Sequence, residues 1–444
     1  MKKKLIYAAI TIVAVIVIGI GVMAYRKPAL VITLGFIAET KLQQTSQEGS
    51  NDCTGLWSVP VTGRKPYSYP AYPETNAAYW LHAWNVNEFG GKQMMKISGD
   101  FPHARYISFH IYNGKTGKAI QALKDVDIQP DEGNRNPFSP SVMRDTPNRS
   151  YTVWIVPEGF AKEGQKNVLT FPDDLENIML FYRIYRPDNG TSALGNSELP
   201  TMETFLADSG KPASGCKSTL IIPESLKKNI QKKADKIFYD DHVKRNEEKQ
   251  VFPFYARYSD YSPFFPNLHI IYGISYLYKE LGDLAVIRFK VPGFPRTGSG
   301  GGRLDLDTDV RYWSVCLGGT KETNTSGCVT DEEALISSDS WVTVVYGPDD
   351  DTLRKTAEEK GHNYETWGFH LASRKIYIRY IDNSKPFHGS YRNVPGTNDP
   401  SENFSADSRE RFEAQNYIGD YAAKGIYCSE EEYLDDTAVK KLTW

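Results

Sequence analysis

The sequence predicts a mainly β protein, in which an N-terminal transmembrane helix precedes two tandem antiparallel β-sandwich domains of jelly-roll type joined by a helical connector. The first observation is composition, since 28 Tyr, 35 Gly and 25 Pro among 444 residues favour strands and turns. The second is a series of short aromatic segments bounded by turn residues, which is typical of a sandwich. The third is an internal repeat of segments in the same order.

The charge balance argues against one large class of partner. The chain has 52 Lys and Arg against 55 Asp and Glu, which gives a formal net charge of -3. This balance produces no strong field toward nucleic acid or an anionic membrane surface. We therefore expect no nucleic-acid partner.

The N-terminus has the features of a membrane anchor. Lysines follow Met1, and the unbroken apolar run from Leu5 to Ala24 is long enough to span a bilayer. A cleaved signal peptide is the alternative, because Val22 to Ala24 resembles a cleavage site, although the run is long for one. We expect a membrane anchor or signal segment over residues 1–27 and a juxtamembrane linker over 28–52. The rest of the chain then works outside the cytoplasm, in the periplasm or at the cell surface.

The five cysteines suit an exported chain, in which disulfides persist. Cys316 and Cys328 flank a polar loop and predict a bridge across a hairpin. Cys53 and Cys216 form a candidate second bridge between the start and the end of the first domain, although the sequence leaves the connectivity open. The sequence has no Cys-x-x-Cys, so neither a zinc ribbon nor a thioredoxin-type redox site is indicated.

The domain boundaries follow changes in composition. We expect the first β-sandwich over residues 53–222, a helical connector over 223–250, the second β-sandwich over 251–407, and a C-terminal helix with an acidic tail over 408–444. The connector is charged, with a thin apolar stripe, so a basic membrane-surface helix is the alternative. The expected strands are Ala78–Val86, Gln93–Ser98, Arg105–Tyr112, Tyr151–Val156, Asn177–Tyr185, Leu268–Tyr278, Asp283–Lys290, Val310–Leu317, Trp341–Tyr346 and Lys375–Ile381.

The internal repeat centres on Phe101–Asn113, for which Asp309–Gly319 is a degenerate second copy. Matches in the same order favour a duplicated sandwich domain. The matched pairs are Lys96–Pro102 with Lys290–Pro295, Ala104–Phe109 with Val310–Val315, Tyr151–Glu158 with Val342–Asp349, and Phe181–Asn189 with Tyr377–Asn383.

Several of these segments also carry a resemblance. Arg105–Phe109, Asp125–Ile128, Asn136–Phe138, the Arg311–Cys316 copy with Cys328, and Gly425–Ser429 resemble a group of exported bacterial proteins of unknown function with paired β-sandwich domains. The resemblance covers most of residues 70 to 430. It implies the fold and the location, and it brings no catalytic residues.

Repeated arginines are candidate structural residues. Arg105 and Arg311 share the core face of their strands with apolar side chains, so each needs a carboxylate or carbonyl partner. We favour structural salt bridges over anion binding, because the arginine recurs in both copies. Arg183 and Arg379, which match in the last repeated segment, are also assigned structural roles. The candidate carboxylates are Asp125 and Asp127 for Arg105, and Asp305 and Asp307 for Arg311.

The other face of the first repeated strand is a candidate ligand site. Its polar and aromatic side chains are of the kind that line sugar or small-ligand grooves, and the alternative is a sheet surface covered by a loop. His82 is a further candidate ligand-binding residue, and together with His103 it could join the strand's histidine around a metal. Structural histidines are the competing interpretation. The strand residues are Tyr106, Ser108, His110 and Tyr112.

A loop in the second half offers a candidate metal site. Asp305, Asp307 and Asp309 follow the glycine-rich segment Gly298–Gly302 and present carboxylates at alternate positions, which suits calcium. Solvated or arginine-paired carboxylates are the alternative. We expect no cofactor other than calcium.

The sequence leaves the activity open. It lacks the Gly-x-Ser-x-Gly, His-Glu-x-x-His, Walker and Rossmann signatures. We expect a membrane-anchored extracytoplasmic binding or structural protein of the cell envelope, with an envelope glycan or small ligand as partner. The alternative is an envelope hydrolase that acts on a glycan or ester between the two domains, with His110 or His82 and nearby carboxylates as acid and base.

Overall fold

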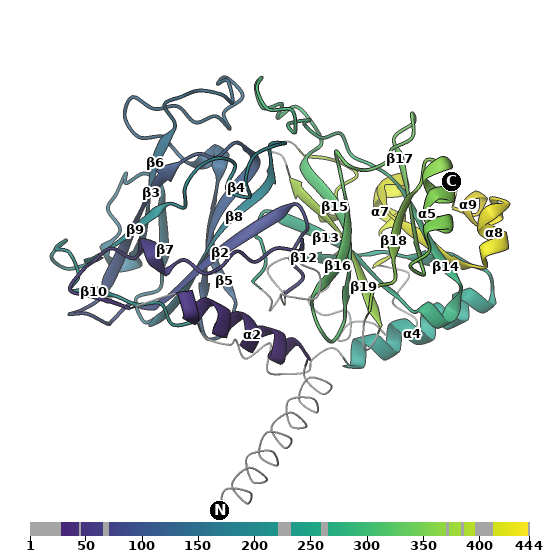
Figure 1. The fold of residues 1–444 in the computed structure, drawn as a ribbon, viewed down its shortest axis with the longest axis horizontal. Coiled ribbons are helices and arrows are strands. Elements are labelled where there is room, and N and C mark those ends of the chain that lie inside the picture. The colour runs from purple at the N-terminus through teal and green to yellow at the C-terminus, as the bar shows by residue number, and fades with distance from the viewer. Residues whose placement is uncertain are drawn as a thin grey trace, which may run out of the picture.

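The computed structural model describes residues 28–43, 46–64, 71–220, 232–258, 265–369, 373–382, 386–395 and 412–442. Within these ranges the protein is mainly β, and two pairs of larger sheets lie side by side (Figure 1). We call them the first and the second sheet pair, in chain order.

The first sheet pair contains a sheet of order β2-β8-β4-β5 and a sheet of order β7-β6-β3-β9. A short ladder, β1 with β10, lies beside them. The strands are β1 (Gln47–Glu48), β2 (Ala77–Asn85), β3 (Gln93–Asp100), β4 (Ala104–Asn113), β5 (Ala119–Lys124), β6 (Ser150–Pro157), β7 (Val168–Phe171), β8 (Asn177–Pro187), β9 (Thr201–Leu206) and β10 (Gly215–Cys216).

The second sheet pair contains a sheet of order β12-β13-β19-β15-β16 and a sheet of order β11-β20-β14-β17-β18. The strands are β11 (Phe252–Pro253), β12 (Tyr255–Tyr258), β13 (Ile270–Leu277), β14 (Leu284–Lys290), β15 (Val310–Gly319), β16 (Thr325–Thr330), β17 (Trp341–Gly347), β18 (Asn363–Thr366), β19 (Arg374–Asp382) and β20 (Lys424–Cys428).

The strand orders of the two pairs correspond. Without the edge strands β11 and β12, the order β13-β19-β15-β16 repeats β2-β8-β4-β5, and β18-β17-β14-β20 repeats β7-β6-β3-β9. The parallel pair β6 with β7 also recurs as β17 with β18, while the other ladders are antiparallel. The segments that match in the sequence therefore occupy equivalent strands.

Alternation along the strands places the cores as the sequence predicts. In β4, Ile107, Phe109 and Ile111 are buried in the core shared with Met95 and Val153 of the facing sheet. The equivalent β15 residues, Trp313, Val315 and Leu317, are buried in the core of the second sheet pair.

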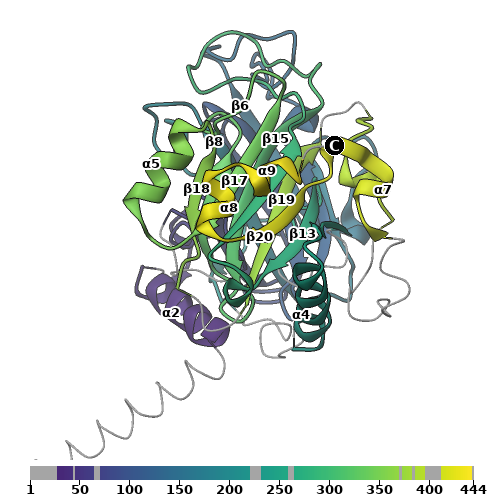
Figure 2. The same cartoon turned by 90° about the vertical axis from the view of Figure 1, so that its right-hand side faces the viewer.

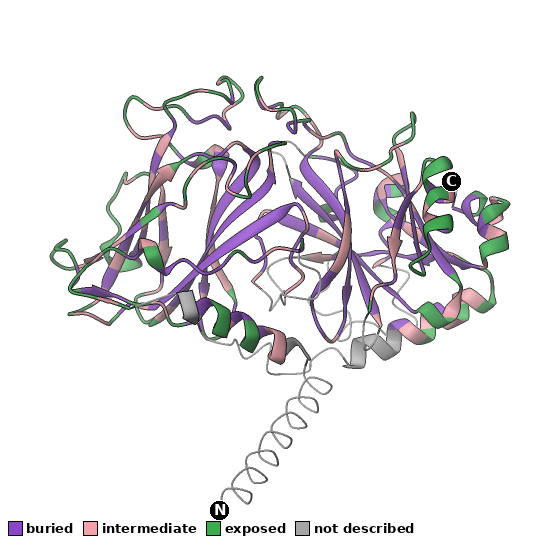
Figure 3. Cartoon of the chain, viewed as in Figure 1, coloured by how far each residue is buried: buried purple, intermediate pink, exposed green. Residues whose placement is uncertain are grey.

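The opposite faces of these strands meet in the middle of the molecule. We call the sheets that contain β4 and β15 the inner sheets. Their facing side chains form one buried cluster, so the two sheet pairs pack against each other through apolar and aromatic surface. Figure 3 colours most of the inner-sheet strands as buried. The cluster includes Tyr106, Tyr112, Tyr185, Ile270, Tyr312 and Ile381.

Buried ion pairs also join the two sheet pairs. Arg105 bonds Asp331, and its Nη2 lies 2.5 Å from Glu332, while Arg311 lies 3.0 Å from Asp125. Each repeated arginine thus has the carboxylate that the sequence analysis required. The partners we assigned were wrong, because each arginine reaches across to the other sheet pair and does not pair within its own.

The helices lie around the sheets. Helices α2 and α4 lie below the strands at the same end of the molecule (Figures 1 and 2). Helix α5 is capped by Asp350, whose side chain accepts hydrogen bonds from two backbone N–H groups. The helices are α2 (Pro28–Gln43), α4 (Lys232–Glu247), α5 (Asp351–Glu359), α7 (Gln415–Ile418), α8 (Glu430–Leu434) and α9 (Thr437–Lys440).

The C-terminal region differs from the prediction of one long helix. Of the described residues in the predicted helix, which runs from about Ser408 to Lys424, Gln415–Ile418 forms α7, and Gly419 ends it with a φ of 52° before the short 3-10 turn Gly419–Tyr421. The next segment, Lys424–Cys428, is strand β20, paired with β11 and β14. A side chain at Gly425 would collide with the Phe252 ring, so the glycine permits this strand to pack there.

The predicted membrane segment, residues 1–27, lies outside the described residues. In the part of the chain that the structure describes, no helix has the length and apolar character needed to cross a bilayer. Helix α2 begins directly after this segment, within the predicted linker, and Phe36 of α2 is buried against the inner sheets.

Both predicted disulfides are present. Cys53 is bonded to Cys216 and Cys316 to Cys328, and Cys428 is buried as a free thiol. Cys316 and Cys328 face each other on the neighbouring strands β15 and β16, which confirms the predicted bridge across a hairpin.

Candidate functional site

A cavity of about 120 Å³ lies between the inner sheets, at the end that helix α2 covers. Phe36 of α2 lines it, together with Tyr79 of β2, Arg183 of β8, Tyr272 of β13 and Arg379 of β19. The cavity therefore exists only where both halves of the chain meet. A concave site with apolar walls and a few polar groups is the usual form of a small-molecule site.

The two inner sheets present the same row of residues to this region. In the first, Tyr79 and Ser108 are the cross-strand neighbours of Arg183 on either side. In the second, the corresponding neighbours of Arg379 are Tyr272 and Ser314. The rows follow from the duplication, and the tyrosine and arginine of each row line the cavity.

Arg183 is buried, and no carboxylate of the described chain pairs with it. Its side chain is held by Nη2, which donates to the Phe265 carbonyl at 2.7 Å, and by packing against the ring of Phe181 at 4.7 Å. Nη1 is buried and has no hydrogen-bond partner within the described ranges. With the whole residue only 3% exposed, this guanidinium has lost most of its water, and no described side chain supplies an opposite charge.

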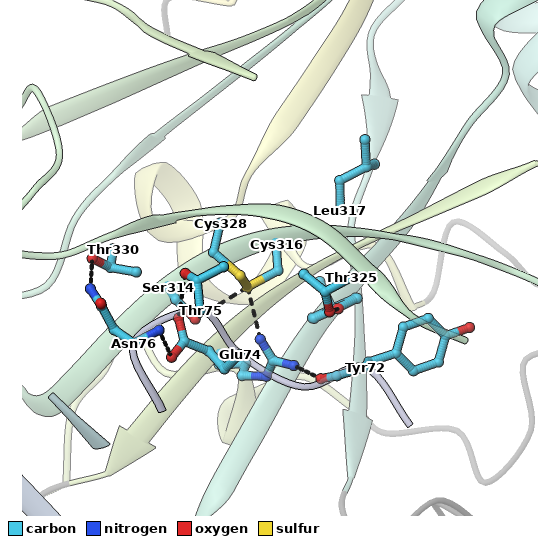
Figure 4. Close-up of a disulfide and its surroundings, with 12 residues drawn as sticks. Tyr72, Glu74, Thr75, Asn76, Ser314, Cys316, Leu317, Thr325, Cys328 and Thr330 are labelled. Atoms are coloured by element: carbon cyan, nitrogen blue, oxygen red, sulfur yellow. Dashed lines mark hydrogen bonds between the residues drawn. A yellow bond between two sulfur atoms is a disulfide. The ribbon is translucent and has the colours of Figure 1, made fainter. Parts of the chain in front are cut away.

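Arg379 is equally buried, at 3% exposed. Its guanidinium donates from Nη1 to Cys316 Sγ at 2.8 Å and from Nη2 to the Tyr72 carbonyl, and it lies 4.3 Å from the centre of the Tyr377 ring. Figure 4 shows the disulfide of Cys316 with Tyr72 and Glu74 beside it. No ion pair joins Arg379 to a carboxylate among the described residues.

Glu74 is the acidic group beside Arg379. Its carboxylate accepts a hydrogen bond from the backbone N–H of Asn76 at 2.8 Å (Figure 4). Burial raises the pKa of Glu74 to about 7, although the charge of Arg379 acts in the opposite direction. A carboxyl that holds its proton near neutral pH leaves much of the positive charge of Arg379 uncompensated.

The cavity is cationic. Arg257 and Lys375 line it in addition to Arg183 and Arg379, and none of its described lining residues is Asp or Glu. Three buried N–H donors in its wall have no partner in the described structure, namely Arg183 Nη1, Arg257 Nε and Asn267 Nδ2. Unpaired donors without an unpaired carboxylate indicate a site that is completed by an anion.

Four other buried arginines of the described chain have a carboxylate partner, whereas buried Arg149 bonds His103 and the Pro102 carbonyl. Arg105 and Arg311 have the carboxylate partners described above, and Arg144 bonds Asp188. Arg186 contacts Glu332 at 3.2 Å. Because a buried charge without a partner is costly, the lack of a carboxylate partner for Arg183 and Arg379 among the described residues favours a functional role for both.

The candidate ligand strip of β4 does not line the cavity. Tyr106, Ser108, His110 and Tyr112 are buried at the contact between the sheet pairs, under residues 265–269. The Leu268 N–H donates to His110 Nε2 at 3.1 Å, and the Tyr112 hydroxyl donates to the Pro266 carbonyl at 2.7 Å. The structure thus places the strip as a sheet surface covered by a loop, the alternative that the sequence left open.

The three candidate histidines lie in different surroundings. His82 Nδ1 lies 3.3 Å from the Leu56 carbonyl, while His103 accepts from Arg149 Nη1 at 2.7 Å. His82 is on the face of its sheet opposite to Tyr79 and the cavity, whereas His110 faces the second sheet pair. Burial lowers the pKa of His82 to about 4 and that of His110 well below 6.5, so both are neutral.

Candidate metal ligands converge at two places in the described chain. Cys53, His82 and Cys216 form one group, and Glu74, Cys316 and Cys328 form the other. In each group the cysteines are joined in a disulfide and offer no thiolate. Asp305, Asp307 and Asp309 are not brought together in this way. The Asp309 carboxylate instead accepts from the Gly293 N–H at 2.7 Å, and calcium there stays a prediction.

Comparison with known proteins adds no function. No family model matches the chain, and no curated protein matches it. An uncharacterised protein from Burkholderia cenocepacia has a similar structure, with a TM-score of 0.44 and 13% identity over 80% of this chain and 83% of its own. A protein from Vibrio parahaemolyticus has a TM-score of 0.36 and 11% identity over 69% of this chain and 84% of its own.

Proposed function

We propose that the chain is an extracytoplasmic binding protein, built from two tandem β-sandwich domains, that holds a small organic anion in the cavity between them. The observation that carries the proposal is the pair Arg183 and Arg379, which are both buried, line one cavity and have no carboxylate partner among the residues that the structure describes. The equivalent strand orders and the two disulfides support the tandem fold and the oxidising location.

The ligand would replace the water that the two arginines have lost. A carboxylate, sulfonate or phosphate group accepts charge-assisted hydrogen bonds from guanidinium N–H groups. Nη1 of Arg183 and the amide of Asn267 are the buried donors that such a group would engage. Apolar lining residues, among them Leu220 and Phe265, would contact the rest of the molecule.

The geometry favours binding over hydrolysis. In the part of the chain that the structure describes, neither His82 nor His110 bonds a carboxylate, and neither lines the cavity between the sheet pairs. Both histidines contact backbone groups, and both are kept neutral by burial. An acid and base pair of the kind that an envelope hydrolase needs is therefore not formed by these two residues.

Titration calorimetry of the purified full chain with acetate, benzoate, methanesulfonate and phenyl phosphate tests the proposal. We expect one-to-one binding of at least one anion. The affinity should fall by about tenfold or more in Arg183→Met and in Arg379→Met, because a charged hydrogen bond contributes about 1.5–3 kcal/mol. Arg135→Met, at an exposed position, is the matched control and should bind as the parent does. Binding of none of the anions, or undiminished binding in both variants, would refute the proposal.

A further inference from the structure

We infer that the anion is a carboxylate with a single aromatic ring, a molecule of the benzoate class. This inference rests on the proposed function and narrows its ligand. Three properties of the cavity carry it: the volume, the aromatic side chains on both walls, and the placement of the cations relative to the apolar lining.

The volume sets the size of the ligand. The cavity has space of about 120 Å³. An engineered apolar cavity of about 150 Å³ binds benzene, whereas drug-sized ligands occupy pockets of about 300–1,000 Å³. A molecule of one ring and one small charged group is on the scale of this cavity. A long acyl chain or a nucleotide is not.

The walls favour a flat ring. Tyr79 and Tyr185 line the cavity from the first inner sheet, and Tyr272 and Tyr377 line it from the second. Tyr79 and Tyr185 pack with their ring centres 5.7 Å apart and their hydroxyl oxygens 3.1 Å apart. Tyrosine rings on opposite sides of a cavity can contact the face and the edge of an aromatic ligand ring. An aliphatic chain does not make these aromatic contacts.

The charges favour a carboxylate at the arginines. Arg183 and Arg379 occupy equivalent places on the two inner sheets, and both act electrostatically on Tyr185, so both belong to one region of the cavity. The fork of a guanidinium matches the two oxygens of a carboxylate. Ile37 of helix α2 lines the cavity as well, and it gives the ring an apolar neighbour.

Calorimetry with a graded series of acids tests the class. The full chain is titrated with acetate, hexanoate, decanoate, cyclohexanecarboxylate, benzoate and phenyl phosphate. We expect benzoate to bind about 10- to 100-fold more tightly than acetate, the gain from burying one ring. Benzoate should also exceed cyclohexanecarboxylate and phenyl phosphate, and decanoate should not exceed hexanoate.

A substitution in the cavity wall tests binding of the aromatic ring independently of binding of the carboxylate. Ile37→Trp reduces the space beside the ring, and Ile37 lies half-buried on a helix at the edge of the fold, so the fold tolerates the change. We expect it to weaken benzoate by at least tenfold and acetate by a clearly smaller factor. Equal losses for both acids would contradict the inferred position of the ring.

The outcomes distinguish this inference from the proposed function. If cyclohexanecarboxylate, decanoate or phenyl phosphate binds best and its binding depends on Arg183 and Arg379, the aromatic carboxylate is wrong and the anion site stands. If no acid in the series binds in a manner that depends on these arginines, both proposals are wrong.

Discussion

Replacing Arg105 tests whether the ion pairs between the sheet pairs hold the protein together. Arg105→Met removes the partner of Asp331, whose side chain is 0% exposed, and one partner of Glu332. Breaking a buried pair by removing one member costs about 3–5 kcal/mol, because the remaining charge stays buried. We expect a loss of that order at pH 8.

The loss should depend on pH, and the sign follows from Asp331. Burial raises its pKa from 3.8 to about 6, while Arg105 acts to lower it. Without Arg105 the pKa rises further, so in the variant the carboxyl keeps its proton over a wider range of pH. A raised carboxyl pKa stabilises the folded state at low pH and ceases to do so as the pH rises through the folded value. The difference between parent and variant should therefore grow from pH 6 to pH 8.

Urea unfolding followed by tryptophan fluorescence measures the free energies of unfolding of the parent and of Arg105→Met at each pH. The double variant Arg105→Met with Asp331→Asn is the control, since it leaves no buried charge at Asp331 and should regain much of the loss at pH 8. A loss below about 1 kcal/mol at pH 8, or one that is the same at both pH values, would refute the reasoning.

Three further predictions concern the cavity. Arg183→Met should lower the free energy of unfolding in urea by less than about 1 kcal/mol, or raise it, because no buried carboxylate loses a partner. A loss of stability as large as that of Arg105→Met would contradict this expectation. Between pH 4.5 and pH 7 the free energy of unfolding of the parent should fall relative to that of Glu74→Gln by roughly 3 kcal/mol, because only the parent has a carboxyl whose folded pKa is about 7. If the difference between the two proteins in urea unfolding does not vary with pH, the pKa of Glu74 is not raised in the folded state. Reduction of Cys316 and Cys328 with a dithiol should weaken benzoate binding in calorimetry, because a thiol beside Arg379 loses its proton readily and the thiolate pairs with the guanidinium. The same treatment of Cys316→Ser with Cys328→Ser should have no effect on binding.

Most of the fold could be predicted from the sequence because strand formation is local. The ten expected strands are all present, and the alternation in Phe101–Asn113 correctly identified the core face of β4. The strands that were not predicted are short or atypical, such as β16, which begins in a polar loop, and β20, which contains Gly425. The C-terminal helix is shorter than predicted in its described part, because α7 ends at Gly419, whose positive φ does not continue an α-helix.

The candidate site could be predicted only in part. The repeat singled out Arg183 and Arg379, since they match in the two copies, but this recurrence was taken as a sign of a structural role. The strip of β4 was chosen for its mixture of tyrosine and histidine. The sequence does not show that residues 265–269 cover that strip, while the neighbouring strands β8 and β19 border the cavity. The better signal was a charged residue repeated in the middle of a buried strand without a nearby carboxylate.

The sequence by itself determined the ten expected strands, the core faces of β4 and β15, and the residues that match between the two halves. Each of these depends on neighbours along the chain or on a fixed period of two. Only the tertiary structure decided which carboxylate serves Arg105 and which serves Arg311, and that Arg183 and Arg379 share one cavity. These contacts join residues about 200 positions apart, and they exist because two copies of one sheet pack face to face. Because of that packing, each arginine pairs with a carboxylate of the other half, and the cavity has walls from both halves.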